Sequence, residues 1–117
     1  MISAGPATRV FLALGATDMR KGYDGLYGLV ISQLQEDPLS GHLFVFANGT
    51  RTRIKVLCWD GTGLWVCGKR LEKGRFSWPS NAEPGGKARL SGAELAMLLG
   101  GIDLQRGRRK AWLRKNE

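Results

Sequence analysis

Long apolar runs, histidine and cysteine are scarce in this sequence, and each scarcity argues against a class of protein. There is no run of about 18 or more apolar residues, and no basic start followed by an apolar stretch and small residues. We therefore expect no membrane span, no signal peptide and a cytoplasmic protein. His42 is the single histidine, and Cys58 and Cys67 are the only cysteines, too few for the usual zinc ligand sets. We expect no metal and no cofactor.

Catalytic chemistry also lacks its usual residues. No glycine-rich phosphate loop ending in Lys-Ser or Lys-Thr is present, and a single histidine leaves the two cysteines without an activating base. Catalysis by two metal ions needs carboxylates that converge on a rigid sheet. The available carboxylates instead lie at predicted caps, turns and helix ends: Asp18, Asp24, Asp60, Glu72 and Asp103. The sequence predicts a protein that is not an enzyme.

Acidic residues are also few, with 10 Asp and Glu against 18 Lys and Arg, so the net charge is +8. Residues 1–68 hold six basic and five acidic groups, whereas residues 69–117 hold twelve basic and five acidic groups. Such an excess suits a polyanionic partner. Residues 106–115 contain six cations and no acid. We interpret residues 1–104 as a single domain and residues 105–117 as a basic C-terminal tail.

Glycine, by contrast, is plentiful. Seventeen glycines in 117 residues, with 43% apolar residues, favour a loop-rich α+β domain over a helix bundle. The predicted architecture is a small antiparallel β-sheet, a meander of about four to five strands, with two helices packed on it.

The centre of this prediction is a three-stranded meander between Arg53 and Pro79. Side chains alternate along residues 53–59, which places Ile54 and Cys58 on one face and Lys55 on the other. Two turns separate the strands, an Asp-Gly turn at 60–63 and a connector at 72–74 with Gly74 in a left-handed position. The predicted strands are 53–59, 64–71 and 75–78. The registers that fit this hairpin pair Cys58 with Trp65 or Val66, so we expect reduced, partly buried thiols.

Further elements are predicted on either side of the meander. Residues 9–14 and 41–46 indicate strands, and residues 80–87 have the composition of an exposed loop. Asp18 suits the N-cap of a helix through Leu34, although its glycines leave open a start at Asp24. Gly22, Gly25 and Gly28 share one face of that helix and would admit a neighbouring backbone. Ser91 and Glu94 form a capping box for a second helix over 89–102.

Short motifs in a fixed order connect these elements to a known family. In chain order they are ATDMRKG at 16–22, HLFVF at 42–46, WDGTGL at 59–64, KRLE at 69–72, GRF at 74–76, WP at 78–79, LL at 98–99 and GID at 101–103. Over residues 8–104 the chain resembles the TnpB accessory protein of the insertion-sequence-66 (IS66) family of bacterial transposable elements. The resemblance implies a protein encoded beside a large transposase and needed for efficient transposition. It brings no catalytic residues.

Nucleic-acid binding is the remaining physical opportunity, and three groups of cations are candidates. Meander cations interleaved with tryptophans could form one positive stripe, two cations follow the Asp18 cap, and the tail is basic. The candidate DNA-binding residues are Arg20, Lys21, Arg53, Lys55, Lys69, Arg70, Lys73, Arg75, Trp78, Arg108, Arg109 and Lys110. The alternatives are a solvated basic face, an ion pair between Arg20 and Asp18 or Asp24, and structural tryptophans, at least two of Trp59, Trp65 and Trp78.

The predicted function is that of a non-catalytic accessory factor for DNA transposition that binds DNA through a basic sheet face and the tail. The expected partners are DNA and the transposase of the same element, with no membrane, and a homo-oligomer is left open. The alternative is a protein-protein adaptor that docks on the transposase without contacting DNA.

Overall fold

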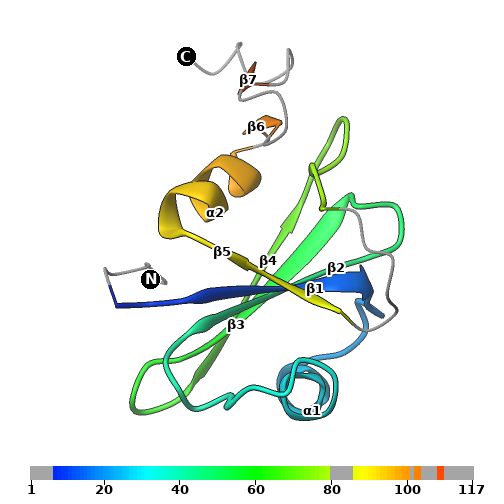
Figure 1. Cartoon of the computed structure of the whole chain (residues 1–117). Coiled ribbons are helices and arrows are strands. Elements are labelled where there is room, and N and C mark those ends of the chain that lie inside the picture. The colour runs from blue at the N-terminus through cyan, green and yellow to red at the C-terminus, as the bar shows by residue number, and fades with distance from the viewer. Residues whose placement is uncertain (1–6, 80–85, 101, 104–107, 110–117) are drawn as a thin grey trace.

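A five-stranded sheet with one helix on each face forms the body of the computed structural model (Figure 1). The structure describes residues 7–79, 86–100, 102–103 and 108–109. The strands of the sheet are β1 (Val10–Ala16), β2 (Leu43–Ala47), β3 (Arg53–Trp59), β4 (Leu64–Arg70) and β5 (Lys87–Leu90). The helices are α1 (Tyr23–Ser32) and α2 (Gly92–Leu99), and β6 (Ile102–Asp103) pairs with β7 (Arg108–Arg109) in a separate two-stranded sheet.

The strand order is β4-β3-β2-β1-β5. Only β1 and β2 run parallel, because α1 and its flanking loops carry the chain between them; the other neighbours are antiparallel. This confirms the predicted α+β class, as a five-stranded and mostly antiparallel sheet with two helices packed on it, whereas the parallel β1–β2 pair was not predicted. The consecutive meander is β2-β3-β4, with β1 and β5 added beyond it.

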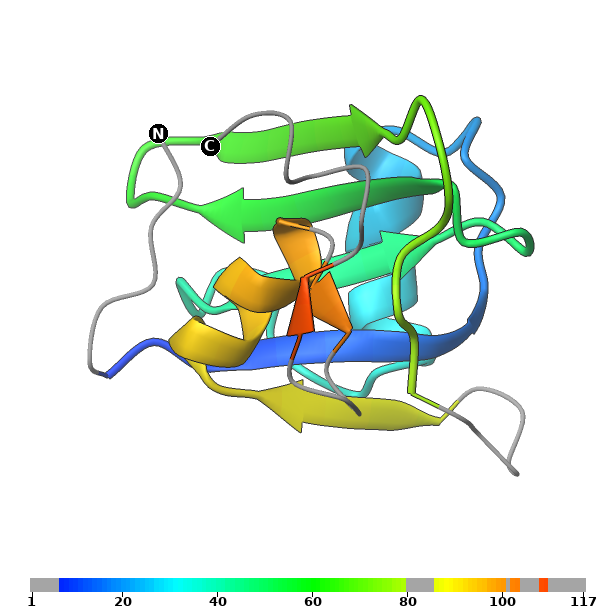
Figure 2. The ribbon, with the colours of Figure 1, turned by 90° about the horizontal axis from the view of Figure 1, so that it is seen from above.

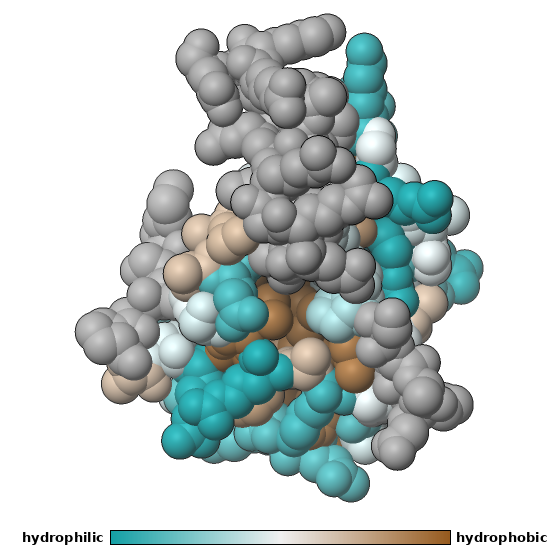
Figure 3. Space-filling model, turned by 45° about the horizontal axis from the view of Figure 1, so that its top comes forward, coloured by the Kyte–Doolittle hydropathy of each residue, from teal (hydrophilic) through white to brown (hydrophobic). Residues whose placement is uncertain are grey.

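Alternation along the strands divides the core into two layers. On the α2 side, Ile54 and Val56 of β3 pack with Val10, Val45 and Leu98. On the α1 side, Leu57 packs with residues from α1 and from β1 and β2: Leu26, Val30, Phe11, Phe44 and Phe46. With one layer on each side, the central strands are buried on both faces, which fits their nearly continuous apolar sequences. Figure 3, turned so that the side with α2 comes forward, also shows some apolar side chains at the surface among hydrophilic ones.

The prediction for the first helix was wrong at both ends. It begins at Tyr23 after Gly22, which provides no side-chain cap, and it ends at Ser32. Asp18 does not cap a helix, because its carboxylate accepts hydrogen bonds from the backbone and side chain of Arg20. The alternative start near Asp24 was the better one.

One strand prediction and the start of the second predicted helix also fail. Residues 75–78 do not form a strand, because the Phe76 N–H donates to the Arg51 carbonyl in the β2–β3 loop and the buried Phe76 ring packs into the α2-side core. β4 is therefore an edge strand. Residues 89–90 belong to β5, which pairs with β1, and not to the second helix. α2 does have the predicted Ser91–Glu94 capping box, but it ends at Leu99.

Several local predictions are confirmed. Asp60 closes the β3–β4 turn by accepting the N–H groups of Thr62 and Gly63 at 2.9 Å, and Gly74 is left-handed at φ +70°. Cys58 lies opposite Trp65, and both cysteines are free thiols. Cys58 is half-buried as predicted, whereas Cys67 is exposed because β4 is an edge strand.

Candidate nucleic-acid interface

Two arginines face each other directly at the end of the β3–β4 ladder. Arg53 pairs with Arg70, and the hydrogen bond from the Leu71 N–H to the Thr52 carbonyl makes the next pair the hydrogen-bonded one. Arg53 and Arg70 are thus a non-hydrogen-bonded pair, the closer kind, with Cα atoms about 4.5 Å apart. Like charges directly opposite each other are destabilising. The pair would gain from an anion between or beside the two guanidinium groups.

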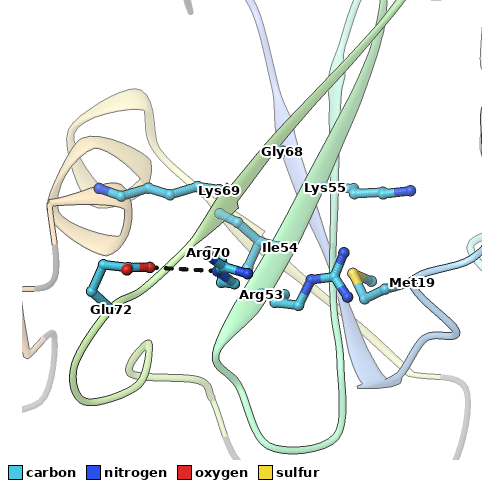
Figure 4. A pocket seen from close by; sticks show the side chains of 8 residues that line it. All are labelled: Met19, Arg53, Ile54, Lys55, Gly68, Lys69, Arg70 and Glu72. Atoms are coloured by element: carbon cyan, nitrogen blue, oxygen red, sulfur yellow. Dashed lines mark ion pairs between the residues drawn. The ribbon is translucent and has the colours of Figure 1, made fainter.

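Lys55 extends this positive charge along β3. It lies opposite Gly68, whose lack of a side chain leaves the lysine uncovered from that strand, and its Nζ donates to the Lys21 carbonyl at 2.9 Å. Arg53, Lys55 and Arg70, which we call the basic cluster, leave the α1 face of the sheet together because they share one alternation phase. They line an open hollow of about 380 Å³ with Met19, Ile54, Gly68, Lys69 and Glu72 (Figure 4).

Glu72 is the only acid among the residues that line this hollow. Its carboxylate lies 3.4 Å from Nε of Arg70, and both side chains are largely exposed. An exposed ion pair of this kind contributes little and is screened by salt. Within the described part of the chain, the guanidinium of Arg53 has no ion-pair partner at all. The hollow therefore remains a net positive site.

Lys69 points to the opposite face from the basic cluster. It pairs with Ile54, and its Nζ donates to the Leu99 carbonyl at the end of α2, 2.6 Å away. In Figure 4 the Lys69 side chain runs toward the helix while Arg53 and Lys55 point the other way. The single stripe predicted along the meander is thus divided between the two faces.

Arg20 is committed to an ion pair. Its guanidinium lies 2.8 Å from Oδ2 of Asp18, and Oδ1 of Asp18 accepts the backbone N–H of Arg20. These contacts lower the pKa of Asp18 from 3.8 to about 2 and raise the pKa of Arg20. The alternative of an Arg20–Asp18 pair is confirmed, although the Arg20 side chain remains 91% exposed. Lys21 follows it and is exposed as well.

The loop after β4 adds two more exposed cations, Lys73 and Arg75. Trp78, by contrast, is held by the fold. Its Nε1 donates to the Ala13 carbonyl at 3.1 Å, its ring packs against the α2-side core, and the guanidinium of Arg51 lies 5.1 Å from the ring centroid. Arg51 was not a predicted site residue, and its backbone is left-handed at φ 59°.

Among the tail candidates, Arg108 and Arg109 lie in β7, and Lys110 lies outside the described residues. His42 is used locally, because its Nδ1 accepts the backbone N–H of Arg9 at 2.9 Å. Within the described ranges, no group of three or more His, Cys, Asp and Glu side chains could hold a metal ion. The helices of the described residues, α1 and α2, are both too short to span a bilayer.

Comparison with known proteins adds the decisive observation. A family model described as IS66 Orf2-like protein matches residues 8–109 of this chain. The chain belongs to the IS66 Orf2-like family. Members of this family have an accessory role associated with transposition, so the chain is connected with the IS66 transposition machinery.

Two proteins from Sinorhizobium fredii are similar to this chain over most of their length. The uncharacterized protein y4hO is 46% identical over 103 residues, which covers 88% of each chain. The uncharacterized protein y4jC is 36% identical over 110 residues, or 94% of this chain and 92% of the relative. No solved structure matches the chain significantly. The IS66 Orf2-like match includes β7, beyond residue 104, so it gives no support for the predicted domain boundary there.

Proposed function

We propose that this IS66 Orf2-like protein is a non-catalytic cytoplasmic accessory factor that binds DNA through the basic cluster while the transposase of the same element performs the chemistry. The observation that carries the proposal is the Arg53–Arg70 pair. A fold gains nothing from two arginines in a close cross-strand pair, whereas a phosphate between them would relieve the repulsion and accept charge-assisted hydrogen bonds from both.

The neighbouring cations define the footprint. Lys55 lies two residues along β3 on the same face, and exposed Lys73 and Arg75 follow β4 in the chain. With Arg53 and Arg70, five cations could therefore meet the phosphate backbone from this end of the sheet. Lys21 is near through its carbonyl contact with Lys55, and Arg20 is exposed but already paired. Lys69 lies on the opposite face of the sheet from the basic cluster, and Trp78 packs against the α2-side core, so both contribute chiefly to the fold. The tail residues Arg108, Arg109 and Lys110 would add non-specific contacts.

Salt-dependent DNA binding tests the proposal. If about five phosphates are neutralised, the slope of log K against log salt is near −4 to −5. Replacing Arg53 and Lys55 with alanine should lower affinity for all duplex sequences alike and make the slope shallower by about 2. The matched control is the Arg9→Ala, Arg89→Ala double variant, which removes the same charge from exposed positions toward the opposite, β5, edge of the sheet. Equal losses in both double variants would reject a localised interface.

One observation favours the adaptor alternative. Trp65 on the edge strand β4 is 44% exposed, and partly exposed aromatic residues are common anchors of protein interfaces. An adaptor would co-purify with the transposase after nuclease treatment and lose that association on Trp65→Ala. Association that disappears with the nuclease alone would instead support DNA as the bridge.

A further inference from the structure

The outer edge of β4 is unpartnered in the part of the chain that the structure describes. β4 pairs with β3 alone, over all seven of its residues from Leu64 to Arg70. Figure 2 shows β4 as the outermost strand on one side of the sheet, with the shorter β5 on the other. A straight seven-residue edge in full register offers its backbone to another strand.

The hydrogen-bonding phase of β4 is known from both of its ends. The Asp60 N–H donates to the Gly63 carbonyl before the strand, and the Leu71 N–H donates to the Thr52 carbonyl after it. Hydrogen-bonded and non-hydrogen-bonded pairs alternate between these points. The backbone groups that point away from β3 therefore belong to Leu64, Val66, Gly68 and Arg70.

We propose that this edge pairs with the same edge of a second copy of the chain, antiparallel and centred on Cys67. Centring on Cys67 is the one register that matches all seven residues of β4 with all seven of its copy, and it satisfies every outward N–H and C=O. Val66 and Gly68 exchange hydrogen bonds with Gly68 and Val66 of the second copy, and Cys67 meets Cys67.

The side chains in this register complement one another. Trp65 lies opposite Lys69 of the second copy, and Leu64 lies opposite Arg70, so no two cations of β4 are directly opposed. The indole of Trp65 is already oriented, because its Nε1 donates to Oδ2 of Asp60 at 2.7 Å, and 44% of the residue is exposed. The aliphatic part of Lys69 would pack on that ring, as lysine stems commonly do.

The distribution of residues along β4 favours a second copy over a different strand. Both cations lie at its end, Lys69 and Arg70, while Leu64 and Trp65 lie at its start. An antiparallel copy brings the cationic end of each strand against the apolar end of the other. An acidic extended peptide would complement only the cationic end and would leave Trp65 exposed.

Such pairing has a consequence for the basic cluster. An antiparallel pair about an axis perpendicular to the sheet keeps the α1 faces of both copies on one side. The two basic clusters would then form one larger positive surface, although the pairing itself does not depend on DNA binding. Because each copy carries +8, we expect the pairing to strengthen with salt or with a bound polyanion.

Sedimentation of the full chain over a concentration series tests the pairing. Gly68→Pro removes an N–H that points outward and leaves the β3 ladder its hydrogen bonds, so the dimer should weaken on the order of thirtyfold through two lost bonds. Cys67→Lys places two cations directly opposite each other at an exposed position and should weaken it about fivefold. Ile31→Lys is the matched control, because it adds the same charge at an exposed position on α1, away from the β4 edge, and should weaken the dimer much less.

Cross-linking is a second measurement of the pairing, and it does not require β4 to accept a proline at position 68. Non-hydrogen-bonded pairs hold Cα atoms about 4.5 Å apart, within the range of a disulfide. Diamide, which accepts the two electrons and two protons of the thiols, should join two chains through Cys67. Cys58→Ser should retain the cross-link and Cys67→Ser should lose it.

Three results would overturn the proposal. One is a monomer throughout the series at moderate salt. Another is a dimer that Cys67→Lys and Ile31→Lys affect equally, which would indicate a different interface. The third is slow hydrogen exchange of the Val66 and Gly68 amides in a monomer, because a segment of the chain's own would then occupy the edge.

Discussion

The Arg53–Arg70 pair is the feature of single residues that the stability of the fold does not explain. Arg53 and Arg70 lie directly opposite each other, and only Arg70 has an acidic neighbour within 4 Å, Glu72, among the described residues. Lys69, by contrast, donates to the Leu99 carbonyl at the end of α2 and contributes to the fold. The pair instead costs the fold a small amount of free energy.

Replacing Arg53 with threonine should therefore raise the free energy of unfolding by about 0.5 kcal/mol, because it removes the cross-strand repulsion and introduces a residue that favours strands. The same change should weaken DNA binding. Chemical denaturation of both proteins measures the first effect. Arg53→Lys keeps the charge and should show no gain in stability; a loss of stability in Arg53→Thr would mean that the arginine stem packs usefully.

Asp18 offers a test at a second residue. Its pKa of about 2 lies below its usual 3.8 because of the hydrogen bonds from Arg20, so the contact stabilises the fold above pH 3.8 and is lost as the pH falls through about 2. In Arg20→Ala, carbon-detected titration of the Asp18 carboxyl should find its pKa moved back toward 3.8. An unchanged pKa would show that the ion pair does not persist in solution.

Among the elements, α1 is the least well specified by local sequence. No side chain caps it, and glycines occupy two of its ten positions, Gly25 and Gly28. The predicted role of these glycines, a close approach by another backbone, was wrong. A Cβ at Gly22 or Gly28 would meet nothing within 4 Å, and one at Gly25 would meet the Lys21 side chain. The helix is held by Leu26 and Val30, which pack against the sheet.

Gly28→Ala should consequently stabilise the protein by about 0.5–1 kcal/mol, since alanine restricts the unfolded chain and fits the helix without a clash. Gly25→Ala is the matched comparison, because its Cβ would lie 3.0 Å from Cβ of Lys21 and should cancel much of that gain. Thermal unfolding of the two variants measures the difference. Equal gains in stability for the two variants would mean that the Lys21 side chain moves aside without cost.

The whole molecule is organised by one sheet that is shared between two apolar layers. Leu26 of α1 and Leu98 of α2 are both fully buried, on opposite faces of the same central strands. If either layer were exposed to solvent, one face of β1, β2 and β3 would be exposed with it. Strands buried on both faces should make the sheet and its helices unfold together.

Leu26→Ala and Leu98→Ala should each lower the free energy of unfolding by about 2–5 kcal/mol. Both should shift one common transition, observed by far-ultraviolet circular dichroism and by tryptophan fluorescence together. Two separate transitions in Leu98→Ala would show that α2 and β5 form an independently unfolding unit.

Local sequence alone determined the features whose physics is local. The Asp60 turn, the Ser91–Glu94 capping box, left-handed Gly74 and the alternation of β3 each depend on residues within a few positions of one another, and each is confirmed.

Tertiary structure decided the features that depend on distant partners. Phe76 was predicted in a strand, but its N–H donates to the Arg51 carbonyl and its ring packs into the α2-side core. β4 is therefore an edge strand of the sheet. Asp18 was predicted to cap a helix, but Arg20 occupies its carboxylate. The basic cluster follows from a register, since Arg53 and Arg70 are seventeen positions apart and only the β3–β4 ladder sets them face to face while turning Lys69 away. The sequence shows which residues are cations, whereas the strand pairing determines which of these cations lie on the same surface.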